Sequence, residues 1–81
     1  MAKCDKLLEK AHNNPKGLRF TELVQLAECY GFTFARQKGS HRSYKRAGFP
    51  KLLNLQPEQG GMAKKYQVLE LLGYIEELSE E

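Results

Sequence analysis

Apolar residues recur at helical spacing in two stretches of the first half of the chain. A narrow stripe over residues 3–12 comprises Leu7, Leu8 and Ala11. A second stripe, over residues 21–30, comprises Leu23, Val24, Ala27 and Tyr30. Phe20 and Thr21 have the pattern of an apolar residue followed by an N-cap, and Gly31 stands where a helix commonly ends. We therefore predict helices over residues 3–12 and 21–30.

The period of the pattern changes to two after Gly31, which indicates strands. Apolar and polar residues alternate over residues 32–37, 40–46 and 51–56. Lys38–Gly39 can form the first turn, because glycine adopts positive φ at no steric cost. Three consecutive strands with short connections predict an antiparallel meander, a sheet that can be covered on one face and wet on the other.

A third apolar stripe, the most extended of the chain, follows the strands: Val68, Leu71, Leu72, Ile75 and Leu78. Its spacing predicts an amphipathic helix. The order of elements, helix, helix, three strands and helix, predicts an α+β fold in which helices pack on one face of the sheet. At 81 residues the chain is long enough for one modest core and too short for several.

Positive charge is concentrated in the strand region. Between Cys29 and Pro57 there are six basic residues and no acid, whereas the rest of the chain holds seven basic residues and all ten acids. A polyanion responds to such a local field and not to the total charge of +3. The chain has no apolar run long enough to span a bilayer and no secretory signal at Met1, so we expect a cytoplasmic protein that does not bind membranes.

The cysteines and histidines predict neither a disulfide framework nor a metal site. Cys4 and Cys29 are too few and too far apart, and their spacing relative to His12 and His41 matches no ligand pattern. We expect two reduced thiols, no metal and no cofactor. His12, at the end of the first predicted helix, is expected to be an ordinary surface residue.

His41 is the candidate catalytic residue, because it lies in the basic stretch directly after a turn. An imidazole titrates near neutral pH and can take the proton from an RNA 2′-OH, while cations stabilise the charge that develops on the phosphate. Candidate substrate-binding residues around it are Lys38, Gly39, Ser40, Arg42, Ser43, Lys45 and Arg46. A second imidazole is missing nearby, so Tyr44, a lysine or water would have to protonate the leaving oxygen.

Strand alternation predicts which of these residues share a face. His41, Ser43 and Lys45 should lie on one face, and Arg42, Tyr44 and Arg46 on the other. If Tyr44 packs under the helices with Phe34, His41 and Lys45 face outward together. The same parity places Arg36 with Phe32 and Phe34, so that Arg36 contributes to the site only from an edge.

The segment Arg36–Tyr44, preceded by Tyr30–Phe32, resembles the HicA family of toxin ribonucleases. Leu53–Gln56 and Lys65–Val68 are similar to later segments of one branch of that family, and the likeness extends over residues 19 to about 75. The resemblance implies a fold like the double-stranded-RNA-binding domain over residues 19–81, with residues 1–18 as an N-terminal helical extension. It also implies a metal-independent mRNA interferase whose catalytic histidine corresponds to His41, with a HicB-like antitoxin as partner.

Two departures from the family pattern bear on these expectations. The family core normally lacks the first helix, and Arg42 stands where many members carry histidine or an aliphatic residue. The first leaves the role of the extension open, and the second implies weaker or differently tuned cleavage. Two alternatives to a ribonuclease are also kept. One is a non-catalytic module that reads the shape and backbone of RNA. The other is a basic domain that binds an acidic protein. The oligomeric state is not predicted.

Overall fold

The computed structural model describes residues 3–79, and within them the predicted α+β fold is confirmed. Positions 1 and 2 of the predicted extension, and 80 and 81 of the predicted domain, lie outside the described residues. The elements in order are α1 (Lys3–Asn13), η1 (Pro15–Gly17), α2 (Phe20–Cys29), β1 (Thr33–Lys38), β2 (His41–Lys45), β3 (Leu53–Leu55), η2 (Gln59–Gly61) and α3 (Lys65–Ser79), where η denotes a 3-10 helix.

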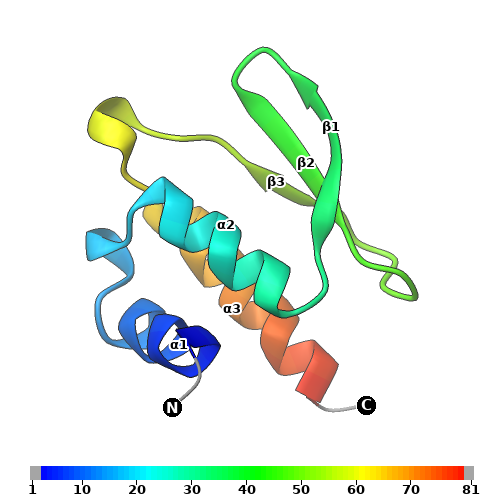
Figure 1. Ribbon diagram of the computed structural model, residues 1–81, viewed down its shortest axis with the longest axis horizontal. Coiled ribbons are helices and arrows are strands. Elements are labelled where there is room, and N and C mark those ends of the chain that lie inside the picture. Colours follow the sequence, from blue (N-terminus) through cyan, green and yellow to red (C-terminus); the bar gives the residue numbers. More distant parts are fainter. Residues whose placement is uncertain (1–2, 80–81) are drawn as a thin grey trace.

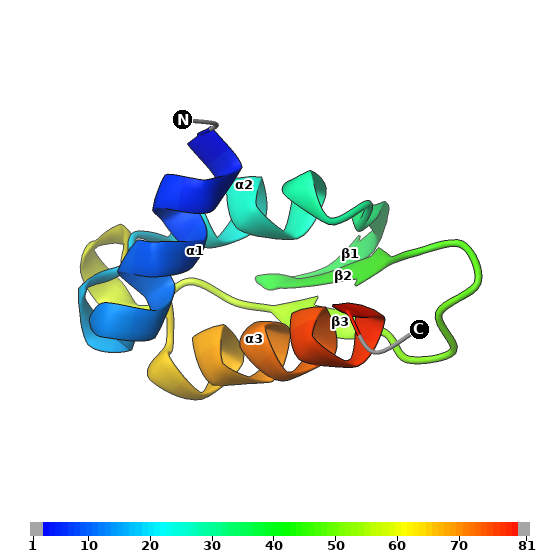
Figure 2. The same ribbon diagram turned by 90° about the horizontal axis from the view of Figure 1, so that it is seen from below.

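The strands form an antiparallel meander in the order β1-β2-β3, as predicted. Figures 1 and 2 show α2 and α3 on the same side of this sheet, and α1 beyond them, at the end of the molecule farthest from the strands. Within residues 3–79, the other face of the sheet carries no helix. None of the helices over residues 3–79 is long and apolar enough to cross a membrane.

One hydrophobic core joins α1, α2, α3, β2 and β3. Helix α1 contributes Leu7 and Ala11, which belong to the same cluster as the buried residues of α2, α3 and the sheet. The largest fully buried side chains are Phe32, Leu18, Leu23, Leu26, Leu53, Leu55, Leu71 and Val68. Burial of each such side chain stabilises the fold by about 1.5–3 kcal/mol. The N-terminal helix is thus packed into the core.

Three aromatic rings attach the β2–β3 connection to α3. Phe49 meets Phe32 edge-on at 5.7 Å and Tyr74 at 5.1 Å between ring centroids. The Tyr74 hydroxyl donates a hydrogen bond of 3.3 Å to the Leu52 carbonyl oxygen, and burial raises the pKa of Tyr74. These contacts fix the position of β3 relative to α3.

Helix α2 begins one residue earlier than expected, and Arg19 occupies the N-cap position predicted for Thr21. The Glu22 carboxylate explains the shift, because it accepts a 2.9 Å hydrogen bond from the Arg19 backbone N–H. Glu22 also pairs with Lys10 of α1 at 2.8 Å. These interactions lower the pKa of Glu22, the hydrogen bond from Lys10 being the largest cause.

The prediction of two reduced thiols was wrong, because Cys4 and Cys29 form a disulfide with a Cα–Cα distance of 5.8 Å. Cys29 is exposed at the end of α2, not packed on its core face. The first turn of α1 carries Cys4, and the disulfide holds it against this end of α2. The pairing depends on how two helices cross, which no local sequence pattern records.

Candidate nucleic-acid interface

The side chains of β2 point alternately toward the core and toward the uncovered face of the sheet. Tyr44 is buried, whereas His41 and Lys45 are exposed, as the alternation predicts. Ser43 faces Asn54 of β3 and donates a 3.0 Å hydrogen bond to its side-chain carbonyl oxygen. The predicted face of His41, Ser43 and Lys45 is therefore confirmed.

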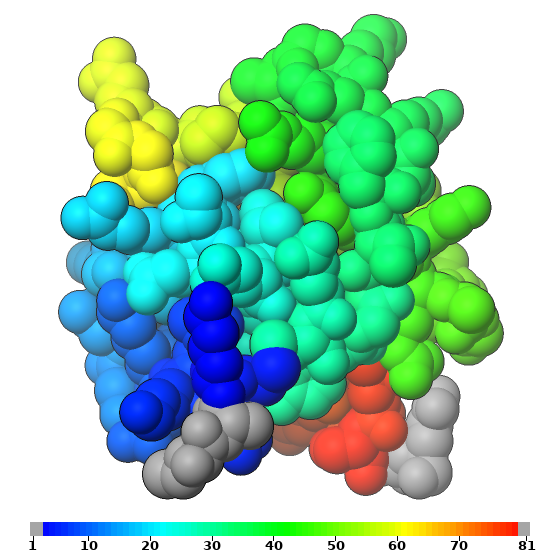
Figure 3. Space-filling model, in the orientation of Figure 1, coloured from blue at the N-terminus to red at the C-terminus, as the bar shows by residue number. Residues whose placement is uncertain are grey.

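Tyr44 packs under the helices, but Phe34 does not. Its side chain is 54% exposed, although its ring contacts the buried Tyr44 edge-on at 5.9 Å. Every residue of β1 is exposed, because the β1–β2 hairpin extends past the helices. The green hairpin stands out in the same way in the space-filling view of Figure 3.

A β-bulge at Ala35 moves Arg36 to the face of His41. Phe34 pairs with Tyr44, and Arg36 pairs with Ser43, so two steps along β1 match one step along β2. Residues opposite each other in a sheet share a face, so Arg36 lies with Ser43 and Lys38 lies with His41. The prediction that Arg36 shares a face with Phe34 was wrong.

The turn that precedes His41 consists of Gly39 and Ser40. Gly39 has φ of 62°, and the Gln37 side-chain amide donates a 2.9 Å hydrogen bond to the Gly39 carbonyl oxygen. A two-residue turn with positive φ at its first residue suits the twist of a hairpin. It leaves Lys38 and His41 as the last cross-strand pair, next to the turn.

A shallow open pocket lies along this end of the hairpin, lined by Arg36, Gln37, Lys38, His41 and Ser43. It brings together the imidazole of His41, the candidate base, the guanidinium of Arg36 and the ammonium of Lys38. No salt bridge within residues 3–79 involves Arg36, Lys38 or Lys45. Their positive charge is therefore not neutralised by a neighbouring carboxylate, and it faces solvent.

Two of the predicted substrate-binding residues lie on the helix side of the sheet. The Arg42 guanidinium is stacked over the buried Phe20 ring, 5.2 Å from its centroid. Arg46 donates a 2.9 Å hydrogen bond from Nε to the carbonyl oxygen of Tyr30, next to the end of α2. A cation at a helix C-terminus is stabilising. Both arginines thus have structural contacts and lie away from His41.

A chain of polar contacts, not foreseen from the sequence, joins the turn before His41 to α3. The Gln56 amide donates to Ser40 Oγ at 2.9 Å, and its oxygen accepts from Lys64 Nζ at 3.1 Å. The buried Gln67 holds Gln56 in turn, because its Oε1 accepts from the Gln56 backbone N–H at 3.0 Å. The available sequence signal was Gln67 itself, a polar residue four positions before Leu71 and therefore on the apolar face of the last helix.

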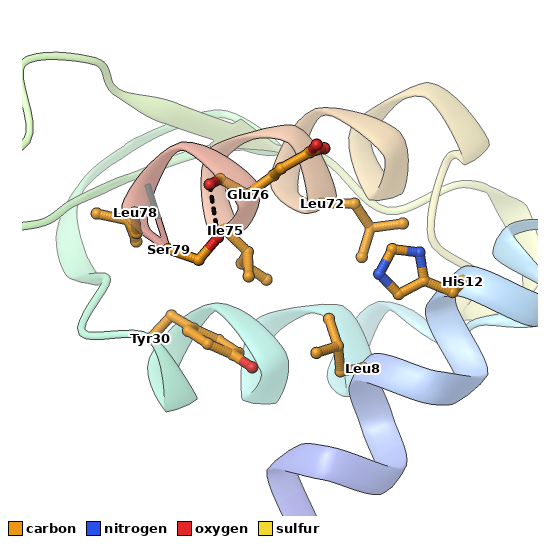
Figure 4. Close-up of a pocket in the computed structure, with 8 residues that line it drawn as sticks. All are labelled: Leu8, His12, Tyr30, Leu72, Ile75, Glu76, Leu78 and Ser79. Carbon is orange, nitrogen blue, oxygen red and sulfur yellow. Dashed lines mark hydrogen bonds between the residues drawn. The ribbon is translucent and has the colours of Figure 1, made fainter. Parts of the chain in front are cut away.

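His12 lies in a different hollow, between α1, α3 and the end of α2 (Figure 4). Most of its lining is apolar, from α1 and α3, and the His12 ring points toward Leu72. Leu8, Tyr30, Ile75, Glu76, Leu78 and Ser79 complete the lining. No lysine or arginine lines this hollow. His12 is exposed, as expected for a surface residue.

No three His, Cys, Asp or Glu side chains in the described part of the chain are grouped closely enough to hold a metal ion. Comparison with known proteins adds no assignment, because no protein-family model, curated protein or solved structure matches this chain.

Proposed function

We propose that this protein is a metal-independent endoribonuclease that cleaves single-stranded RNA at the hairpin pocket. One observation carries the proposal: His41 and the cations Arg36 and Lys38 line the same open pocket, on a sheet face without carboxylates. Phosphodiester cleavage needs these two features together, a base for the 2′-OH and positive charge for the phosphate oxygens.

In the proposed reaction His41 accepts the proton of the 2′-OH, and the 2′-oxygen attacks the phosphorus. The bond from phosphorus to the 5′-oxygen breaks, which gives a 2′,3′-cyclic phosphate and a 5′-OH end. Arg36, Lys38 and Lys45 bind the phosphates. Tyr44 is excluded as the general acid, because its side chain is buried on the other face of the sheet. A lysine or water is left to protonate the 5′-oxygen.

The resemblance to HicA toxins supports the same reading. The order α2–β1–β2–β3–α3, with both helices on one side of the sheet, agrees with the double-stranded-RNA-binding fold that the resemblance implies. In this proposal the substrate is mRNA in the cytoplasm and a HicB-like antitoxin covers the pocket. Helix α1 is held against this domain by its core contacts, the Lys10–Glu22 pair and the Cys4–Cys29 disulfide.

One observation favours a second candidate, a non-catalytic RNA-binding module. The open face offers a single imidazole, and the burial of Tyr44 removes one of the groups that we considered as the acid. Such a module would bind RNA through Arg36, Lys38 and Lys45 without cutting it.

The two candidates are separated by incubating a long single-stranded RNA with purified protein in EDTA. The variants are His41→Ala and, as a matched control, His12→Ala, which removes the other histidine of the chain. We expect the parent and His12→Ala to cut and His41→Ala to be slower by about 10²- to 10⁴-fold. If all three proteins bind the RNA without cutting it, the proposed enzyme is ruled out and the non-catalytic binding module takes its place.

A further inference from the structure

Tyr66 is the most exposed large aromatic side chain of the described residues, and nothing in the proposed catalysis uses it. It lies in the first turn of α3 and is 63% exposed. The Lys64 ammonium lies 6.0 Å from the centre of its ring. Lys64 is the residue that Gln56 connects to Ser40, next to His41. An exposed ring and a cation are thus linked, through the Gln56 side chain, to the turn that precedes His41.

We propose that Lys64 and Tyr66 form a subsite for the nucleotide that flanks the cleaved phosphate, with its base stacked on Tyr66 and its phosphate bound by Lys64. This inference rests on the proposed function, and it specifies that the RNA substrate is single-stranded at this subsite. Bases of single-stranded RNA stack on exposed aromatic rings, whereas a duplex keeps its bases stacked on one another. The RNA would pass over the hydrogen bonds by which Gln56 bridges Ser40 and Lys64, between the hairpin and α3.

The arrangement of the bridge fits this path. Gln56 is held at its backbone by the buried Gln67, so Ser40 and Lys64 keep a defined separation. Figure 3 shows a notch at the same end of the molecule, between the hairpin and the η2 loop. Glu58 and Glu70 are the acids nearest to Tyr66 in sequence on either side, and neither forms a salt bridge with Lys64.

Phe34 is the other exposed aromatic residue, and its position excludes it from this role. It is 54% exposed, but it shares a face with Tyr44 and not with His41. A base stacked on Phe34 would lie across the hairpin from the catalytic pocket. Phe34 is therefore a matched control, similar in exposure and different in location.

The test measures binding of a short single-stranded RNA that contains 2-aminopurine, a base whose fluorescence is quenched by stacking. The proteins carry His41→Ala to prevent cleavage and are compared with added Tyr66→Leu, Tyr66→Phe or Phe34→Leu, in EDTA. We expect Tyr66→Leu to weaken binding by about 5- to 100-fold and to lose the quenching at one base position. Tyr66→Phe and Phe34→Leu should keep both. Circular dichroism establishes that each variant is folded.

The outcomes separate this subsite from the proposed function. If Tyr66→Leu leaves affinity and quenching unchanged, while the parent with His41 intact binds and cleaves RNA, the subsite alone is overturned. Absence of RNA binding by the parent would overturn both. Equal weakening by Tyr66→Leu and Phe34→Leu would also overturn the subsite, because RNA binding would then not depend on which exposed aromatic ring is removed.

Discussion

Arg36 lies directly across the sheet from Ser43, although Phe34, two residues earlier, lies across from the adjacent Tyr44. The extra residue, Ala35, shifts the alternation of side chains along β1 by one position. Phe34 lies on the face that Tyr44 turns to the helices, whereas Arg36 and Lys38 lie with His41 on the opposite face. A single inserted residue thereby assembles the cationic pocket.

This placement predicts that two arginines of the basic stretch act differently. Arg36→Ala should weaken RNA binding and reduce the slope of log K against log salt by about 0.7, because one phosphate contact of a single strand is lost. Arg46→Ala should leave that slope unchanged, since its guanidinium binds the Tyr30 carbonyl. Titrations of one RNA at several salt concentrations measure both. Equal changes in slope would contradict the assignment of faces.

Arg46 should instead contribute to stability. Removing its hydrogen bond to Tyr30 leaves a helix C-terminal carbonyl without a cationic donor, and we expect a loss of about 1–2 kcal/mol in the free energy of unfolding. Urea denaturation of Arg46→Ala measures the loss, with the exposed Lys45→Ala as control. An Arg46 variant as stable as the Lys45 variant would rule out the capping role.

Tyr44→Phe should cleave RNA at the parental rate. The Tyr44 side chain is buried beneath the sheet and cannot reach a phosphate beside His41. Loss of a general acid would slow cleavage by about 10²- to 10⁴-fold, so the distinction is large. Single-turnover cleavage rates decide it. A rate as low as that of His41→Ala would mean that Tyr44 reaches the substrate.

The disulfide between Cys4 and Cys29 should stabilise the fold without affecting the pocket. Its sequence separation of 25 corresponds to about 3.5 kcal/mol by loop-closure entropy. Cys4→Ser/Cys29→Ser, or the parent in dithiothreitol, should therefore unfold at lower urea and bind RNA with unchanged affinity. Thiol titration of the untreated, unfolded parent provides the control, and two free thiols there would disprove the crosslink.

Acid should weaken the contact between α1 and α2. The pKa of Glu22 is lowered from its ordinary value of 4.5, so the folded state binds its proton less readily than the unfolded chain. The stabilisation by Glu22 is therefore complete above about pH 4.5 and is lost as the pH falls through the lower, folded-state pKa. Glu22→Gln should lose up to about 1 kcal/mol at neutral pH and less at pH 3.

The matched variant for this measurement is Glu28→Gln, which changes an exposed carboxylate of the same helix that forms no salt bridge within the described residues. Urea unfolding at a series of pH values compares the two. A difference between them that stays constant from pH 7 to pH 3 would show that Glu22 does not titrate in the folded state below its ordinary value.

The sequence predicts most of the fold because local periodicity determines it. Leu53 and Leu55 alternate with Asn54, and the stripe from Val68 to Ile75 keeps one helical face, so burial follows the pattern. The bulge at Ala35 was missed because no glycine or other characteristic residue accompanies it. The bridge through Gln56 depends on tertiary approach of β3, the hairpin turn and α3, which spacing along the chain does not encode.

The division of β2 and β3 between two faces has a consequence for natural variation. Tyr44, Leu53 and Leu55 support the core, whereas His41, Lys45 and Asn54 have no packing role. In the proposed ribonuclease, substitutions at the second group should therefore change cleavage or RNA binding while the molecule keeps its fold. The open face of the sheet can accept new side chains without any repacking of the core, so its chemistry can vary independently of the scaffold.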